Sequence, residues 1–403
     1  MSMLRDLSVY DYIEKQDYDA VAGPDWPSYE QFKSHLNIQE FVYDEVDTML
    51  AVPKPFNDPA YCVLPFYAIE YPQTTPCCLL KDDVDLDQLK SNMLSGVRDP
   101  ACHKCWKLED TGIKSDRLIK NETLDFYFDR NLQALFEESR NNKNSVVNYK
   151  IDGANLCNAT CVTCNSYFSS SWARLEEKNQ YQPKKTWKFT LEQSDQLIDY
   201  ATAKHISFRG GESLLISKHF EILEKLLANN NTDCGISFVT NGSVKLNKYQ
   251  KNIISKFKHV NFCFSIDGVG PVFEYLRFPL KWNDLLENIA YCRDSNIMAS
   301  VSYTLSNLNI LYHDQTVDWF QKNNLNFIVN PVYSPDYFSP SSLPVSVKKQ
   351  IMTTSPSTTF LLGQHSDADD VRYKNARQEI LRQDQMKNIR LQDYLPELAQ
   401  LLG

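Results

Sequence analysis

The fold is decided by the stretch Val146 to Cys164, which reads VVNYKIDGANLCNATCVTC. Its first part, Val146–Ile151, is a short run rich in apolar residues, which predicts a strand. Its second part is a polar loop that carries three cysteines in the spacing C-x3-C-x2-C. A strand that runs directly into a loop of this kind can present the loop's thiols to a ligand.

Five further apolar runs follow this strand, and longer helical segments separate several of them. The predicted strands are 205–208, 235–240, 260–266, 298–305 and 327–332, and the clearest helical segments are 191–203, 220–228 and 282–294. Six strands in alternation with helices predict parallel strands joined by helical crossovers. Periodicity leaves two arrangements open, an open doubly wound sheet and an incomplete barrel. In both, functional residues follow the carboxyl ends of the strands.

The chain of 403 residues is long enough for two or three domains at ~150 residues each. Shifts in composition predict five segments. These are an acidic extension over 1–54, a cysteine-rich segment over 55–125, a helical connector over 126–144, the strand–helix repeat over 145–335 and a helical C-terminal extension over 336–403.

Composition excludes several classes of protein. Apolar residues make up 42% of the chain and aromatic residues 12%, which excludes disorder as the overall description. Lys and Arg total 42 against 51 Asp and Glu, and the net charge of −9 argues against a broad nucleic-acid interface. No apolar run approaches the ~18 residues of a membrane helix, and the N-terminus lacks the apolar core of a signal peptide. We therefore predict a soluble cytoplasmic protein whose 11 cysteines stay reduced.

The cysteine triplet Cys157, Cys161 and Cys164 predicts an iron–sulfur site. Three thiolates from one loop can hold three corners of a 4Fe–4S cube and leave the fourth iron free for a small molecule. Zinc is an alternative, but it requires four ligands and no histidine lies in this loop. Three unrelated core cysteines are the other alternative.

Polar or glycine-rich loops follow the next three predicted strands. After the second strand comes Arg209-Gly210-Gly211-Glu212-Ser213, where two glycines allow close backbone approach and Glu212 offers a carboxylate to an ammonium group. The third strand ends in Thr240-Asn241-Gly242 and the fourth in Ser265-Ile266-Asp267-Gly268. Each of these two loops alone is typical of a capped turn.

On these four loops together the chain resembles the radical SAM superfamily. The resemblance implies an α/β fold, a partial (β/α)6 TIM-like barrel, in which the triplet holds a 4Fe–4S cluster whose open iron binds S-adenosylmethionine. The residues that it implies for S-adenosylmethionine are Gly210, Gly211 and Glu212 at the amino group, and Asn241, Ser265 and Arg277 at the carboxylate and ribose. Thr163 stands where the family usually has an aromatic residue. No residue is assigned a catalytic role beyond the cluster.

A second group of cysteines precedes the barrel. Cys102 and Cys105 form a CxxC pair, and Cys62, Cys77 and Cys78 supply further thiols, enough for one complete metal site. Zinc held by four cysteines is an alternative here. The region resembles the twitch domain, a short relative of the SPASM auxiliary-cluster domain, and this implies an auxiliary 4Fe–4S cluster.

The ligands that this second resemblance implies are Cys62, Cys78, Cys102 and Cys105, with Cys77 as the alternative to Cys78. The three remaining cysteines, Cys234, Cys263 and Cys292, lie in apolar surroundings, and we predict that they are buried in the core.

The resemblance implies an enzyme that reductively cleaves S-adenosylmethionine to a 5′-deoxyadenosyl radical, which abstracts hydrogen from a substrate carbon. A second cluster could accept the remaining electron, so we predict an oxidative modification. Relatives with such domains mostly modify peptides, and some act on aminosugars or nucleotides. We predict a peptide substrate, with dehydrogenation or rearrangement of a small molecule as the alternative, and an external electron donor such as flavodoxin or ferredoxin. A non-catalytic iron–sulfur electron carrier and a zinc-stapled interaction protein are the rivals from other classes.

Overall fold

The computed structural model describes most of the chain beyond the predicted N-terminal extension. The described residues are 60–71, 75–77, 79–80, 83–110, 115–128, 131–184, 191–332, 335–351, 353, 358, 362–363 and 369–402. The predicted acidic extension over 1–54 and the candidate ligand Cys78 therefore lie outside them. Among the described residues, no helix is both long and apolar enough to cross a membrane.

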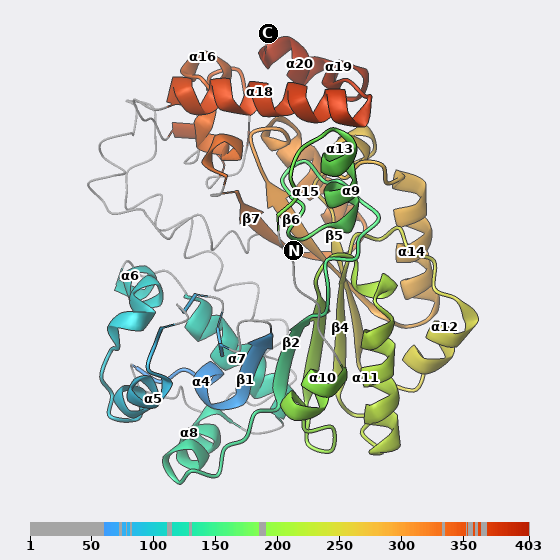
Figure 1. Ribbon diagram of the computed structural model, residues 1–403. Coiled ribbons are helices and arrows are strands. Elements are labelled where there is room, and N and C mark those ends of the chain that lie inside the picture. The colour runs from blue at the N-terminus through green and yellow to red at the C-terminus, as the bar shows by residue number, and fades with distance from the viewer. Residues whose placement is uncertain are drawn as a thin grey trace.

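One parallel sheet of seven strands organises the molecule (Figure 1). The strands are β1 (Ala68–Tyr71), β2 (Asn148–Asp152), β3 (His205–Arg209), β4 (Gly235–Thr240), β5 (Val260–Ser265), β6 (Met298–Leu305) and β7 (Asn326–Pro331). They pair in chain order, and every neighbouring pair is parallel. Right-handed crossovers in a constant direction place the connecting helices on one face, so the sheet curls into a half-barrel around the other. The predicted partial TIM-like α/β fold is confirmed.

The number of strands differs from the prediction by one. The six predicted strands are all present, and β1 adds a seventh from within the cysteine-rich segment. Its four residues, Ala68–Tyr71, are too short for a periodic signal, and their partner β2 lies almost 80 positions later in the chain. The cysteine-rich segment thus contributes an edge strand to the half-barrel, while the predicted domain limits stay a prediction.

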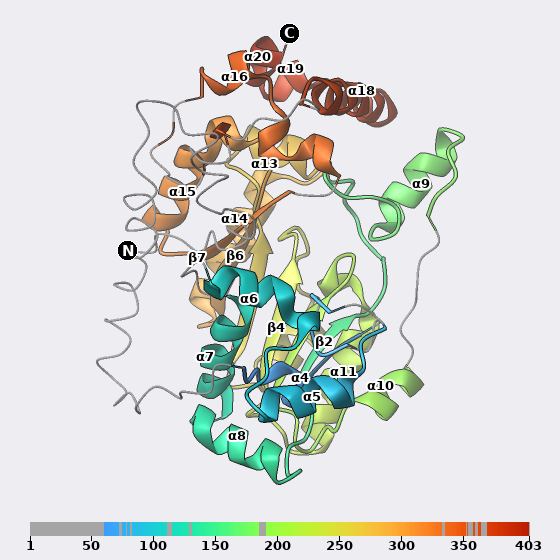
Figure 2. The same ribbon diagram turned by 90° about the vertical axis from the view of Figure 1, so that its left-hand side faces the viewer.

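Most of the helices that follow strands cover the outer face of the sheet, whereas the first of them lies away from the sheet, against the C-terminal helices (Figures 1 and 2). Those that follow strands are α9 (Ser170–Lys178), α10 (Leu191–Leu197), α11 (Ser217–Ala228), α12 (Lys248–Ile254), α13 (Pro271–Leu276), α14 (Trp282–Asp294) and α15 (His313–Lys322). Helix α10 ends before the predicted residue 203. The reason is that the Asp199 carboxylate accepts the backbone N–H of Ala201 and Thr202 and forms a turn.

Alternation along each strand separates a buried outer face from a polar inner face. Among the outward side chains beneath the helices, Phe208 stacks on Phe238, and Phe238 meets Phe262 edge to face. Full burial of such a side chain contributes ~1.5–3 kcal/mol. The inner face carries half-buried small polar side chains. These are Ser207, Ser237, Ser265, Ser300, Ser302 and Thr304. The concave side of the half-barrel is therefore a polar surface.

A second, smaller core lies in the predicted cysteine-rich segment together with the helical connector that follows it. Its helices are α4 (Leu64–Tyr67), α5 (Leu86–Leu94), α6 (His103–Asp110), α7 (Asp116–Phe128) and α8 (Leu132–Arg140). Tyr61, Phe66 and Phe136 form its aromatic centre, with Tyr61 edge-on to Phe136 at 5.1 Å between ring centroids. The segment is thus packed around its own apolar cluster, although β1 joins it to the sheet.

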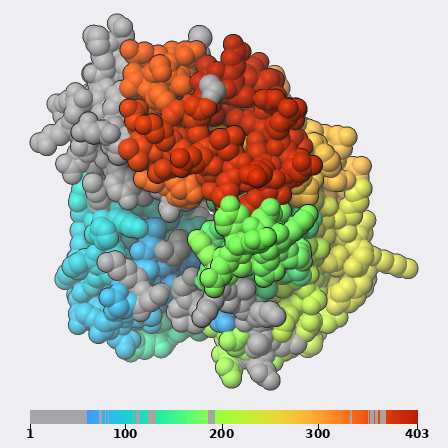
Figure 3. Space-filling view, turned by 45° about the horizontal axis from the view of Figure 1, so that its top comes forward, coloured from blue at the N-terminus to red at the C-terminus, as the bar shows by residue number. Residues whose placement is uncertain are grey.

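The C-terminal extension lies over the carboxyl edge of the sheet (Figure 1). It contains α16 (Val345–Lys348), α18 (Asp369–Lys387), α19 (Leu391–Tyr394) and α20 (Pro396–Leu402). Figure 3 shows these helices beside the segment that contains α9, and α18 contacts α9 while α19 contacts α13. The predicted helical C-terminus is therefore present, and it covers the end of the sheet from which the candidate loops project.

Candidate functional site

The loop that carries the cysteine triplet is held by its backbone from two sides. On one side, Thr160 N donates to Phe278 O at 2.7 Å and Val162 N donates to Leu276 O at 2.8 Å. On the other, the Ser171 hydroxyl at the start of α9 donates to Cys157 O at 2.7 Å. These bonds fix the loop between α9 and the segment that follows α13.

The three thiols lie in one electrostatic neighbourhood. Burial, and then the neighbouring Cys161 thiol, raise the pKa of both Cys157 and Cys164 to about 12. All three are free thiols, so none is lost to a disulfide. A metal that binds here must displace the thiol protons, which makes binding pH-dependent.

The donor set is chemically suited to an iron–sulfur cube. A cubane takes its cysteine ligands on separate irons, and three thiolates on one loop could hold three of the four irons. Within the described ranges, no group of three or more His, Cys, Asp or Glu side chains is arranged to hold a single metal ion.

Arg277 brings a positive charge to this loop. Its Nη1 lies 3.9 Å from Cys161 Sγ, its Nη2 donates to Asp267 Oδ1 at 2.9 Å, and its Nε lies 2.8 Å from Asp267 Oδ2. Burial works against the charged guanidinium, but the Asp267 carboxylate and the Cys161 thiol outweigh it and raise the pKa of Arg277. Asp267 also accepts Thr304 N at 2.9 Å, so the carboxylate is itself fixed. The structure therefore places the predicted Arg277 at the cysteine loop with Asp267 as its anchor.

Gly210 and Gly211, in the loop after β3, lie directly against the backbone of the segment that precedes Cys157. Gly210 has φ +112°, and a Cβ there would lie 2.5 Å from Ala154 O. A Cβ on Gly211 would meet the backbone of Leu156, with its carbonyl carbon at 2.6 Å. The glycines are therefore required where this loop packs against the chain that leads into Cys157. Contact with S-adenosylmethionine stays a prediction for both.

Glu212 is fully buried and already has protein donors. It accepts Thr240 Oγ1 at 2.7 Å, Asn241 N at 2.7 Å and Leu214 N at 3.1 Å. Burial raises the pKa of the carboxyl, against the effect of these hydrogen bonds. A carboxylate has about four acceptor sites, so one remains for a further donor such as an ammonium group.

Asn241 ties the third loop to the cysteine loop. Its Nδ2 donates to Asn158 Oδ1 at 2.8 Å, and Asn158 Nδ2 donates in turn to Ser243 Oγ at 2.8 Å. Asn158 lies between Cys157 and Cys161, and no motif in the sequence singles it out. Ser265 ends β5 on the inner face, half-buried, and no contact between its side chain and the triplet is observed among the described residues.

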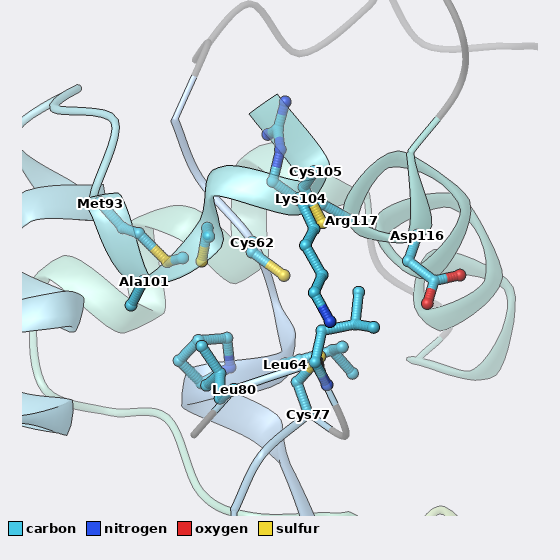
Figure 4. A pocket seen from close by; sticks show the side chains of 13 residues that line it. Cys62, Leu64, Cys77, Leu80, Met93, Ala101, Lys104, Cys105, Asp116 and Arg117 are labelled. Atoms are coloured by element: carbon cyan, nitrogen blue, oxygen red, sulfur yellow. Dashed lines mark hydrogen bonds between the residues drawn. The ribbon is translucent and has the colours of Figure 1, made fainter. Parts of the chain in front are cut away.

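The predicted auxiliary site coincides with a cavity (Figure 4). The cavity, which is partly open to solvent, is lined by Cys62, Cys77, Cys102 and Cys105 among others. Burial raises the pKa of the Cys62 thiol and raises that of Cys102 to about 12, with neighbouring thiols adding to both effects. Because Cys78 lies outside the described residues, only Cys77 of that pair can be placed, and it lines the cavity.

The remaining cysteines follow the prediction in part. Cys234 and Cys292 are fully buried in the core. The prediction is wrong for Cys263, which is half-buried on β5 and faces the opposite side from Phe262 and Phe264. The apolar neighbours in sequence misled the prediction, because in a strand they point away from Cys263.

A contact that the sequence did not predict comes from the C-terminal extension. Gln383 on α18 donates through Nε2 to Val162 O at 3.0 Å, inside the cysteine loop. Lys387 on the same helix is also buried, and burial lowers its pKa to about 8. No sequence signal points to this contact, because the two segments are more than 200 residues apart.

The chain matches no family model and no curated protein. Among solved structures it is similar to native anSMEcpe with bound AdoMet and the Kp18Cys peptide, at 15% identity and a TM-score of 0.36 over 60% of this chain and 61% of that one. It is also similar to Streptococcus suis SuiB bound to the precursor peptide SuiA, at 14% identity and a TM-score of 0.37 over 74% of this chain and 61% of that one. The chain thus spans less than two thirds of the length of these proteins. Similarity of this degree carries no functional conclusion.

Proposed function

We propose that this protein is a radical SAM enzyme. The observation that supports the proposal best is the set of three thiols on one loop, at the carboxyl end of a parallel strand, with the buried Arg277 guanidinium 3.9 Å from Cys161 Sγ. When bound, a 4Fe–4S cluster together with S-adenosylmethionine supplies a 5′-deoxyadenosyl radical that takes a hydrogen atom from a substrate carbon. Cys157, Cys161 and Cys164 would hold that cluster.

The chain's own residues would orient the cofactor. We propose that Glu212 keeps one acceptor site for the amino group of S-adenosylmethionine, while Thr240 and Asn241 hold the Glu212 carboxylate in place. Gly210 and Gly211 bring this loop against the backbone that leads to Cys157. The remaining proposed contacts to S-adenosylmethionine are Asn241, Ser265 and Arg277.

We also propose a second 4Fe–4S cluster in the cavity of the cysteine-rich segment. Its proposed ligands are Cys62, Cys78, Cys102 and Cys105, with Cys77, which lines the cavity, as the alternative to Cys78. Four thiolates would close the cluster to substrate and make it an electron acceptor, which favours an oxidative outcome. A zinc ion is the alternative occupant. An external donor such as flavodoxin or ferredoxin, and the reducing cytoplasm, complete the proposal.

A polar substrate fits the inner face of the half-barrel. Its small hydroxyl side chains can donate and accept hydrogen bonds, and at the β1–β3 edge Arg209 donates to Glu70 at 3.3 Å and to Asp152 at 2.9 Å. Glu70 also pairs with Lys150. A peptide backbone presents alternating donors and acceptors to such a surface, and a peptide is the substrate class that we propose. An aminosugar or nucleotide is the alternative.

Anaerobic reconstitution followed by assay for 5′-deoxyadenosine tests the proposal. With dithionite and S-adenosylmethionine, the wild-type protein is expected to hold about eight irons and to release 5′-deoxyadenosine. Cys161→Ala is expected to abolish the product, whereas Cys105→Ala retains some cleavage and loses about half of the iron. Cys234→Ala, at a buried thiol outside both sites, is the matched control and behaves as the wild type.

The same assay separates the rival classes. Full iron without any 5′-deoxyadenosine would point to an electron carrier and contradict the proposal. Stoichiometric zinc, with neither iron uptake nor product, would point to a zinc-stapled interaction protein. Cys77→Ala and Cys78→Ala, compared for iron content, decide which of the two neighbours is a ligand.

A further inference from the structure

Helix α18 reaches the cysteine loop through a buried glutamine. Gln383 is 2% exposed, and its Nε2 donates to Val162 O at 3.0 Å. Val162 N is bonded on the opposite side to Leu276 O at 2.8 Å. Val162 lies between Cys161 and Cys164, and both its backbone N–H and its backbone carbonyl are hydrogen-bonded. The carbonyl is bonded to the C-terminal extension.

One turn further along the same helix, a lysine is buried behind Cys161. Lys387 is 8% exposed, its Nζ donates to Gln383 Oε1 at 2.8 Å, and Nζ lies 4.7 Å from the centre of the Trp172 ring. The Trp172 Nε1–H donates to Cys161 O at 2.9 Å, so the ring contacts both the ammonium and the Cys161 backbone. The ammonium and the Cys161 thiol interact electrostatically.

Lys387 forms no direct ion pair with a carboxylate of the described residues, but the carboxylates of Asp384 and Glu379 interact with its ammonium electrostatically. Burial of this ammonium is costly, because the protein interior replaces water poorly. A cation–π contact with Trp172 compensates part of that cost. An anionic group held by the nearby thiols would add to this compensation.

Asp384, the residue after Gln383, binds the helix that leads to Arg277. Asp384 Oδ1 accepts the Tyr275 hydroxyl at 2.9 Å, and Tyr275 lies on α13, two residues before Arg277. The other carboxylate oxygen of Asp384, Oδ2, accepts the backbone N–H of Leu391 at 2.7 Å. Helix α18 therefore contacts both the loop that carries Cys161 and the helix that leads to the arginine beside it.

We propose that α18 is part of the cluster site. Gln383 is a positioning residue that fixes the turn from Cys161 to Cys164, and the ammonium of Lys387 stabilises the reduced, more negative cluster and raises its reduction potential. The inference rests on the proposed function, because it requires a cluster on the triplet. It adds the C-terminal extension to the site, whereas the sequence assigns that extension no role.

A redox titration followed by electron paramagnetic resonance tests the charge of Lys387 on the reconstituted protein. Lys387→Gln keeps a donor for Gln383 and removes the charge. It is expected to shift the reduction equilibrium about tenfold toward the oxidised form, which is ~59 mV for one electron. Lys387→Arg is expected to stay within threefold of the wild type. Lys374→Met, at an exposed lysine of the same helix, is the matched control. A shift below threefold in Lys387→Gln, or an equal shift in the control, overturns the charge role.

Hydrogen exchange tests the positioning role on the apoprotein, without any cluster. Gln383→Leu is expected to speed exchange of the amides from Thr160 to Cys164 at least tenfold, whereas Gln378→Leu, at an exposed position of α18, leaves it unchanged. Equal exchange in the two variants overturns the positioning role. If the wild-type protein assembles no cluster, the proposed function and the charge role fail together, and the exchange comparison still decides whether α18 positions the loop. Thermal melting of each variant confirms that it is folded.

Discussion

Gly211→Ala tests whether this glycine is required because its loop packs directly against backbone. A Cβ at Gly211 would lie 2.6 Å from Leu156 C and 2.7 Å from Asn155 C, and closer still to Leu156 O. These are backbone atoms, so no side-chain rotation can relieve the overlap. Two backbone hydrogen bonds depend on the same approach, Gly211 N to Ala154 O at 2.8 Å and Glu212 N to Leu156 O at 2.7 Å.

The expected cost follows from these contacts. Overpacking by one methyl group costs about 1–3 kcal/mol, and each weakened hydrogen bond adds about 0.5–1.5 kcal/mol. We therefore expect Gly211→Ala to lower the free energy of unfolding by about 2–6 kcal/mol. The displaced backbone leads directly into Cys157, so we also expect the triplet to bind less iron on reconstitution.

Urea unfolding and iron analysis measure these two effects. Gly270→Ala is the matched control, because Gly270 has φ +59° and a Cβ at this position would meet no atom within 4 Å. With ψ at −123°, a non-glycine residue at this position is strained without overlap, at a cost of about 1–3 kcal/mol, and iron content should stay unchanged. Equal unfolding free energies for the two variants, with full iron in Gly211→Ala, would refute the packing argument.

Two further predictions concern buried charge. Asp267→Asn removes the counter-charge of the buried Arg277 and is expected to lower the free energy of unfolding in urea by about 3 kcal/mol. Glu287→Gln, at the exposed ion pair with Lys245, is the control and should lower it by under about 1 kcal/mol. Similar losses in the two variants would contradict the assigned burial of Arg277. The second prediction is a loss of stability in acid. Burial lowers the pKa of His219 to about 4, so the folded state keeps it neutral while the unfolded state, with a pKa of ~6.5, takes up a proton. Its contribution is complete above pH ~6.5 and is lost as the pH falls toward 4, on the order of 3 kcal/mol. In His219→Gln the fall in unfolding free energy over that pH range should be smaller, and an unchanged fall would assign it to other groups.

The sequence predicts the half-barrel well because its strands are local features. Runs such as Gly235–Thr240 and Met298–Leu305 carry enough β-branched and aromatic residues to be recognised alone, and both match the observed strands. The candidate loops follow directly, because they lie at strand ends. β1 is different, since its four residues gain their stability from β2 and not from their own sequence.

Contacts between distant segments could not be predicted in the same way. The sequence offers Gly210 and Gly211 as flexible residues near a ligand, whereas the structure shows that they also make room for the backbone before Cys157. It offers no reason to connect Gln383 with Val162. Pairings of this kind are set by packing of the finished fold, which leaves no periodic trace in the chain.

Curvature of the sheet is what assembles the candidate site. The cysteine loop follows β2 and the Leu276–Phe278 segment follows β5, three strand spacings apart, which is ~14 Å in a flat sheet. Yet Thr160 N and Val162 N donate to Phe278 O and Leu276 O at 2.7 and 2.8 Å. The bend of the carboxyl edge around the concave side shortens the distance that these loops have to span. The same bend carries Arg277 to Cys161, and a residue that sequence places after the fourth predicted strand thereby becomes part of the loop that follows the first.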